Sequence, residues 1–134
     1  MSLSAYTMIA TADGGQKRAE DIVAGDILRE ALTGQNMVVT TTLNSPGVGM
    51  VRVTTENDII LDVTGDQNLL TDAGMLAANR LAPGTGLRMA DGFVKCRDVQ
   101  AIMGDYMVYD LEVENAPDLT PWALANGLVA GVRD

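Results

Sequence analysis

Short runs of apolar or alternating residues recur along the chain, and turn-forming residues separate them. The runs are rich in β-branched residues and lie at 7–11, 37–42, 50–55, 58–64, 93–102 and 106–113. The separators are rich in Gly, Asn, Asp and Pro and include 13–15, 44–47, 65–66, 83–84, 91–92 and 126–127. Evenly spaced short strands are typical of an all-β protein. A short helical or 3₁₀ turn is expected at 18–23 and at 75–81.

The sequence also repeats itself once. The stretch that begins at Thr11 has a counterpart that begins at Thr71; the matched pairs are Ile22 with Leu81, Gly25 with Gly84, Leu28 with Leu87 and Arg29 with Arg88. A solenoid needs roughly three or more short units, so two long copies favour one domain over 1–134 with pseudo-repeats at about 7–65 and 66–132. We expect pseudo-twofold symmetry. Chance recurrence of turn residues is the alternative.

Length and composition fit one folded domain. The chain has 134 residues, of which 47% are hydrophobic and 20% charged. It shows no signal-peptide pattern, and no apolar stretch approaches the roughly 20 residues of a membrane helix, so we expect a cytoplasmic protein without a membrane partner. Its single cysteine, Cys96, cannot form an internal disulfide, which suits a reducing compartment.

Charge and the lack of histidine restrict the possible chemistry. The net charge of −9 would repel phosphate backbones, so a nucleic-acid partner is not expected. The chain contains no histidine, which excludes His-dependent triads and His-ligated zinc. Asp62 and Asp66 are candidate ligands for a hard cation, but no loop concentrates the 6–8 oxygens that Ca²⁺ prefers. We expect neither a metal nor a cofactor.

Three stretches carry a family resemblance. The first contains Ser2 five residues before Thr7, then Asp13-Gly14, Ile22 and Gly25-Asp26. The second contains Thr64, Gln67 and Leu70-Thr71. The third contains Tyr-Asp-Leu-Glu-Val at 109–113, Ala-Asn-Gly at 125–127 and finally Gly131-Val132. In this order and spacing they resemble the conserved blocks of the Hint (Hedgehog/intein) autoprocessing family over nearly the whole chain.

This resemblance implies a flattened, horseshoe-like β structure and a set of candidate site residues. In the family, a Cys or Ser at the position of Ser2 attacks the preceding carbonyl, and a His at the position of Gln67 acts on the scissile amide nitrogen. A Gln side chain has no titratable proton. Gly131 and Val132 stand where the family has a final His-Asn. The relic positions are Ser2, Thr64, Gln67 and Asp118; Asp118 lies where some members carry an acid, but it also fits an ordinary turn.

Three hypotheses about function follow. The first is a Hint-like domain without its chemistry, either inactive or used as a scaffold. The second is residual self-cleavage in a longer parent by a Ser- or Thr-initiated acyl shift, with the flanking polypeptide in cis as the partner. The third is an acidic module that binds basic proteins. We expect no enzyme activity beyond autocatalytic peptide-bond cleavage, and the sequence leaves the oligomeric state open.

Two further expectations concern individual side chains. Ser2 or Ser4, Thr64, Gln67 and the strand end near Gly131 should converge in one cleft, as the family blocks do. Cys96 lies between Lys95 and Arg97, which would lower the pKa of an exposed thiol. Because Cys96 lies in a strand pattern, we prefer the interpretation that it is a small, buried hydrophobic residue.

Overall fold

The computed structural model describes residues 1–114 and 121–133. In this part of the chain it contains strands and two short 3₁₀ helices, so the all-β prediction is confirmed. The elements are β1 (Leu3–Ser4), β2 (Met8–Ala10), β3 (Gln16–Arg18), η1 (Ala19–Asp21), β4 (Ile27–Arg29), β5 (Asn36–Pro46), β6 (Met50–Thr55), β7 (Ile60–Thr64), β8 (Asn68–Thr71), β9 (Gly74–Ala77), η2 (Ala78–Arg80), β10 (Gly86–Met89), β11 (Gly92–Ala101), β12 (Met107–Glu114), β13 (Trp122–Ala125) and β14 (Leu128–Gly131).

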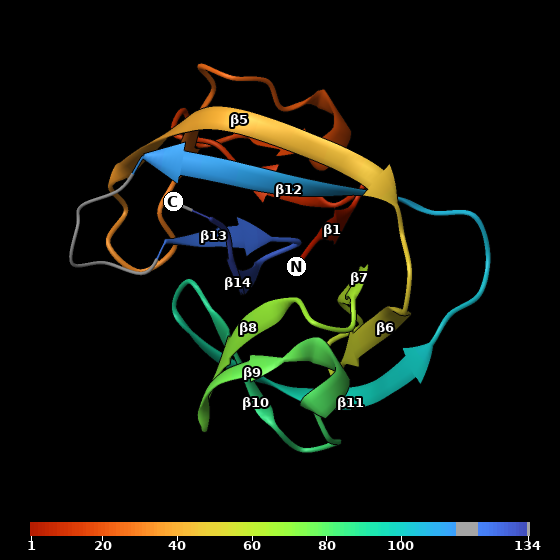
Figure 1. Ribbon diagram of the computed structural model, residues 1–134. Coiled ribbons are helices and arrows are strands. Elements are labelled where there is room, and N and C mark those ends of the chain that lie inside the picture. Colours follow the sequence, from red (N-terminus) through yellow and green to blue (C-terminus); the bar gives the residue numbers. More distant parts are fainter. Residues whose placement is uncertain (115–120, 134) are drawn as a thin grey trace.

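The strands form one continuous antiparallel sheet that bends back on itself. Its order is β3-β2-β13-β14-β8-β10-β11-β6-β7-β1-β12-β5-β4, with β9 paired to β8. Near the two ends of this path, Thr11 and Leu28 form an antiparallel bridge, so the ends approach each other. Figure 1 shows the long strands β5 and β12 crossing one side of the molecule, with the N-terminus near its middle. The short strand β1 is central because it pairs with β7 on one side and β12 on the other.

The core is formed by inward-facing side chains of many strands. Burial alternates along β8 and through most of β6, as expected when one face of a strand packs inward. Ile9, Leu28, Met37, Val53, Leu61 and Val63 are completely buried. Because the cluster draws on strands from both halves of the sequence, the two halves share one core.

The internal repeat reappears in the backbone hydrogen bonds. Ala19 N donates to Thr7 O at 2.8 Å, and Ala78 N donates to Gln67 O at the same distance. Three further bonds of the first copy have counterparts in the second. Glu20 N donates to Ala5 O as Asn79 N donates to Gly65 O, and Ile22 N donates to Ala19 O as Leu81 N donates to Ala78 O. Likewise, Ala12 N donates to Ile27 O as Asp72 N donates to Gly86 O. The repeated sequence therefore builds the same local structure twice, while a twofold rotation that relates the copies stays a prediction.

One turn prediction was wrong, and both helical predictions were too long. The turn expected at 44–47 is mostly strand: β5 runs to Pro46, which pairs with Met107 of β12. The outer side of β5 is covered by β4 only at its beginning, so a proline without an N–H is tolerated at its far end. The helical turns are confined to η1 and η2, since residues 75–77 belong to β9.

Asn126 and Gly127 form the tight turn between β13 and β14. Their φ angles are 51° and 86°, the left-handed pair required by a two-residue hairpin of type I′. This turn places β14 beside β8. None of the described helices is both long and apolar enough to cross a membrane.

Two neighbouring residues of β7 provide a test of this packing. Leu61 is completely buried and Ile60 is 48% exposed. We expect Leu61→Ala to lower the free energy of unfolding by about 2–5 kcal/mol, because it removes buried methyl groups and leaves a cavity. The matched variant Ile60→Ala should cost less than about 1 kcal/mol. Urea unfolding followed by tryptophan fluorescence measures both; equal losses would contradict the assigned orientation of β7.

Candidate functional site

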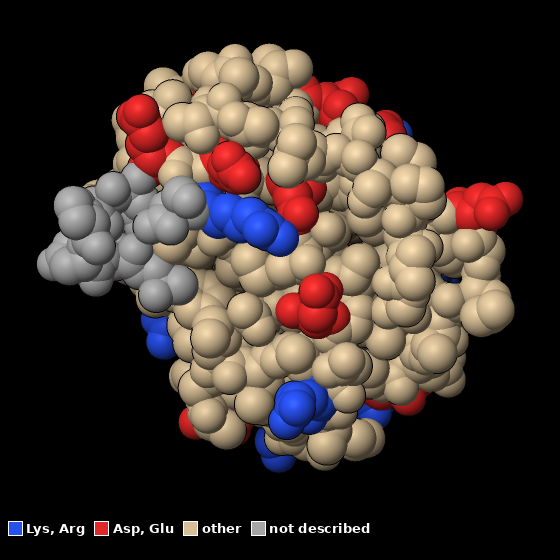
Figure 2. All heavy atoms as spheres, in the orientation of Figure 1, with Lys and Arg blue, Asp and Glu red and all other residues tan. Residues whose placement is uncertain are grey.

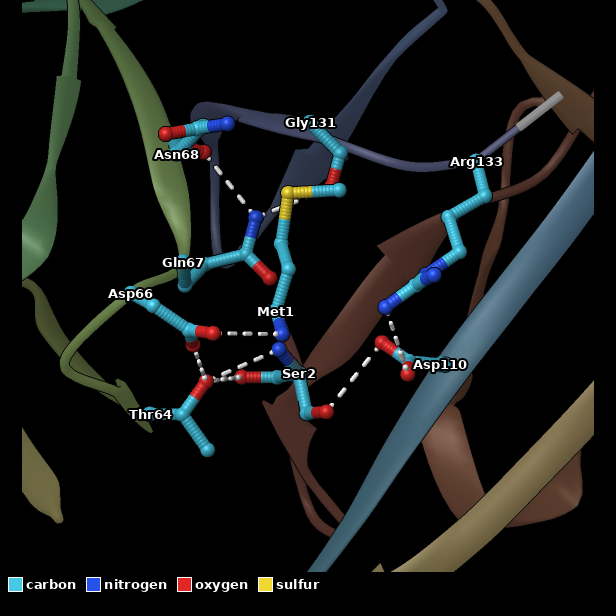
Figure 3. A network of polar contacts seen from close by, with 9 residues as sticks. All are labelled: Met1, Ser2, Thr64, Asp66, Gln67, Asn68, Asp110, Gly131 and Arg133. Atoms are coloured by element: carbon cyan, nitrogen blue, oxygen red, sulfur yellow. Dashed lines mark hydrogen bonds and ion pairs between the residues drawn. The ribbon is translucent and has the colours of Figure 1, made fainter.

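The turn between β7 and β8 lies beside both ends of the described chain. It begins at Thr64 and is closed by a 3.0 Å hydrogen bond from Gln67 N to Thr64 O. Figure 3 shows Met1 and Ser2 beside Thr64 and Asp66 of this turn, and Gly131 beside Gln67. The sheet order explains the convergence, because β1 pairs with β7 while β14 pairs with β8.

Thr64 binds the backbone of Ser2 in two ways. Ser2 N donates to Thr64 Oγ1 at 2.9 Å, and Thr64 N donates to Ser2 O at 3.1 Å. The threonine hydroxyl in turn donates to Asp66 Oδ1 at 2.7 Å, and the amino group of Met1 lies 3.1 Å from Asp66 Oδ2. The bond from Thr64, aided by this ammonium group, holds the pKa of Asp66 below its ordinary value. Thr64 thus accepts a hydrogen bond from the amide nitrogen between Met1 and Ser2.

Gln67 fixes the other side of the turn. Its side chain is 1% exposed, and its Nε2 donates to Gly131 O at 2.8 Å and to Asn68 O at 2.9 Å. A carboxamide nitrogen has two hydrogens, and here each has a backbone carbonyl as its acceptor. Gln67 therefore links β8 to the end of β14.

The hydroxyl of Ser2 contacts a carboxylate that the sequence analysis did not select. Ser2 Oγ donates to Asp110 Oδ1 at 3.1 Å, and Arg133 Nη2 lies 3.4 Å from Asp110 Oδ2. The backbone of Arg133 is held against β12 by bonds to Leu111 and from Val113. The available signal for Asp110 was its place inside an apolar run, since Asp is depleted in strands. No local sequence pattern indicates its contact with Ser2, which lies 108 positions away.

The structure brings together most of the residues expected in one cleft. Ser2, Thr64, Gln67 and Gly131 are joined by the contacts above, whereas Ser4 is buried and bonded to Thr7. Asp118 lies outside the described residues, so its place in the site stays a prediction. A narrow crevice lies between the chain ends; its lining includes Met1, Leu3, Gln67, Asp110, Gly131 and Arg133.

Asp62 is itself buried, and its carboxylate is bonded to Arg52 and Tyr6. Arg52 Nε and Nη2 donate to its two carboxylate oxygens at 2.8 and 3.0 Å, and the hydroxyl of Tyr6 donates to Oδ2. Burial and this bond raise the pKa of Tyr6 to about 12. The described residues contain no group of three or more Asp, Glu, Cys or His side chains that could hold a metal ion.

Cys96 is buried in β11. The residue is 1% exposed, and burial raises the pKa of its thiol. A thiol of this kind is mostly protonated near neutral pH and poorly accessible. The structure therefore favours the interpretation as a small core residue.

The fold matches solved structures of inteins. The gp41-1 intein superposes with a TM-score of 0.82 at 19% identity, over 97% of each chain. The bacterial intein-like domain from Clostridium thermocellum superposes with a TM-score of 0.80 at 21% identity, over 98% of each chain. The DnaB intein from Synechocystis sp. PCC 6803 also superposes with a TM-score of 0.80, at 16% identity over 99% of each chain.

The protein therefore has the Hint fold, the fold of inteins and bacterial intein-like domains, as the sequence resemblance predicted. No protein-family model matches the sequence, and no curated protein sequence matches it.

The Asp62 network predicts a pH dependence of stability. Burial alone would raise the pKa of Asp62, but hydrogen bonds from Arg52 and Tyr6 and the arginine charge outweigh it and hold this pKa below its ordinary value. A carboxyl with a depressed folded-state pKa stabilises the protein above its unfolded-state pKa, and this contribution disappears as the pH falls through the folded-state value.

We therefore expect the free energy of unfolding to fall on acidification from neutral pH, and Asp62→Asn to reduce this fall. Asp58→Asn is the control, because Asp58 also pairs with an arginine, Arg97, but its side chain is 78% exposed. Urea unfolding at a series of pH values measures the effect. A profile in Asp62→Asn that parallels the unsubstituted protein would refute this role.

Proposed function

We propose that this chain is a Hint-fold domain that acts as a folded scaffold and does not carry out protein splicing. The observation that carries the proposal is the environment of Gln67. By the sequence resemblance this residue stands at the position of the family's second-block His. Its Nε2 is bonded to the carbonyls of Gly131 and Asn68, and the carboxamide has no titratable proton.

The surroundings of the Met1–Ser2 peptide bond support the same proposal. For an acyl shift, the departing nitrogen of Ser2 must gain a proton. That nitrogen donates its hydrogen to Thr64 Oγ1, and the threonine hydroxyl directs its own proton to Asp66. Histidine is absent from the whole sequence. The side chains around this nitrogen thus provide hydrogen-bond acceptors where the reaction requires an acid.

The end of the chain supports the absence of splicing. The family's final step needs an Asn whose side chain cyclises, and the matching positions hold Gly131 and Val132. Neither has a side-chain amide. The carbonyl of Gly131 is held by Gln67, and β14 is completed by its pairing with β13 and β8. The segment that ends at Gly131 is therefore a strand held on both sides by its neighbours in the sheet.

One contact favours residual N-terminal cleavage as a second candidate. Ser2 Oγ donates to Asp110 Oδ1 at 3.1 Å, which is within reach of a general base. In such a step Ser2 Oγ would bond to the carbonyl carbon of Met1 and give its proton to Asp110. The carbon–nitrogen bond would break as the Ser2 nitrogen takes up a proton from solvent, leaving an ester and a free amine. The nucleophile thus has a side-chain acceptor for its proton, whereas none of the described side chains donates a proton to the Ser2 nitrogen.

The acidic-module hypothesis rests on the net charge of −9. Figure 2 shows Asp and Glu side chains scattered over the face in view, with basic side chains among them. A basic partner would be attracted by the overall charge, which affects association rates more than it defines a site. We therefore rank this function below the scaffold.

A fusion with a folded reporter placed ahead of Ser2 tests the proposal. We expect the junction to stay intact for days at neutral pH, with or without dithiothreitol. Losing a general-acid contribution of about 10³-fold adds roughly 4 kcal/mol to the barrier. Release of the reporter, measured by mass spectrometry, would instead support the cleavage candidate, and loss of that release in Asp110→Asn would assign the base.

A paired substitution then asks whether only the reacting groups are missing. In Ser2→Cys with Gln67→His, a thiol nucleophile and a titratable group occupy the two positions, so dithiothreitol-dependent release should appear. Ser2→Cys alone is the matched control, because it changes the nucleophile and keeps the amide. Equal release from both would show that position 67 has no influence on the chemistry.

A further inference from the structure

A second, more open pocket lies away from the chain ends. It has a volume of about 470 Å³, within the usual range of small-molecule sites. Three loops surround it: the turn before β3, the turn between β4 and β5, and the start of the β10–β11 turn. Its lining is mostly small or apolar and includes Ala10, Gly15, Ala31, Leu32, Ala90 and Leu124.

Among the described residues that line this pocket, Arg29 is the one that carries a charge. Its guanidinium lies over the turn glycine Gly34, since a methyl group at that glycine would be 3.6 Å from Nη2. None of the ion pairs in the described part of the chain involves Arg29. Among the residues that the structure describes, no acidic side chain pairs with this cation, in a protein with 18 acidic and 9 basic residues.

The nearest acid in the sequence does not compete for Arg29. Glu30 is 2% exposed, and one of its oxygens accepts from Leu32 N at 2.7 Å and Thr33 N at 2.9 Å. Its other oxygen accepts from Trp122 N at 2.9 Å. The carboxylate is therefore turned inward and occupied, so Arg29 keeps its donors for a ligand.

The internal repeat supplies a comparison for this arginine. Arg88 is the counterpart of Arg29 in the second copy, and its Nε donates to Met89 O at 3.0 Å. Its guanidinium also lies 5.4 Å from the centre of the Phe93 ring. The guanidinium of Arg88 thus has partners within the protein, whereas that of Arg29 lies beside a pocket.

We propose that this pocket binds an organic carboxylate through Arg29. A guanidinium matches a carboxylate with two parallel hydrogen bonds, and the small residues around it allow close approach. Leu32 and Leu124 provide an apolar surface for the rest of the ligand. The hydroxyls of Thr11 and Thr33 are already bonded to Asp13 and Glu30, so the arginine is the main determinant of ligand charge.

The test is a titration followed by the amide NMR resonances of Gly14, Gly15 and Gly34. The probes are N-acetyl-L-leucine, which has a terminal carboxylate, and N-acetyl-L-glutamate α-amide, which has only a side-chain carboxylate. The uncharged control is N-acetyl-L-leucine amide. We expect saturable shifts with at least one carboxylate, and the stronger of the two identifies the ligand's source. The amide should bind roughly tenfold or more weakly.

Variants of Arg29 and Arg80 distinguish a specific contact with Arg29 from an effect of net charge on binding. Arg29→Gln should weaken binding by roughly tenfold to hundredfold, and Arg29→Lys should restore part of it. Arg80→Gln removes the same charge from an exposed site in η2 and should bind normally. The proposal fails if neither carboxylate shifts these resonances at about 20 mM. It also fails if Arg29→Gln binds as tightly as Arg80→Gln.

Discussion

The hydrogen bonds made by the turn between β7 and β8 hold the two ends of the described chain together. Thr64 pairs with Ser2 through backbone and hydroxyl, and Gln67 binds the carbonyl of Gly131. An unsatisfied buried carbonyl or amide costs about 1–3 kcal/mol, so these groups must be paired if the ends are to lie in the middle of the sheet. The position of β1 between β7 and β12 depends on the same pairing.

The same constraint shapes what the site can do. A carboxamide that completes the structure by donating both hydrogens to backbone carbonyls cannot also deliver a proton to the amide of Ser2. Asp110 and Arg133 form a charged pair beside Ser2 that positions the hydroxyl without supplying the missing acid. Hint-fold geometry is therefore compatible with a cleft whose polar groups mainly hold the chain together, which is the basis of the scaffold proposal.

Local features were predictable from the sequence, and long-range contacts were predictable only through the family resemblance. The strand at 50–55, the Asn126-Gly127 turn and the register of Ile22 with Leu81 follow from alternation, turn chemistry and the repeat. The turn expected at 44–47 failed because pairing with β12 overrides local preference. The contact of Ser2 with Asp110 depends on strand order, which no local pattern encodes.

The Gln67 side chain is the structural cross-link on which this arrangement depends. Hydrogen exchange of the Gln67 carboxamide, followed by NMR, tests it most directly, with exposed Gln100 in the same protein as the internal standard. Because Gln67 is buried and its Nε2 hydrogens are both bonded, they should exchange far more slowly than those of Gln100, and as slowly as the backbone amides of β14. Exchange at the rate of Gln100 would contradict this structural role of Gln67.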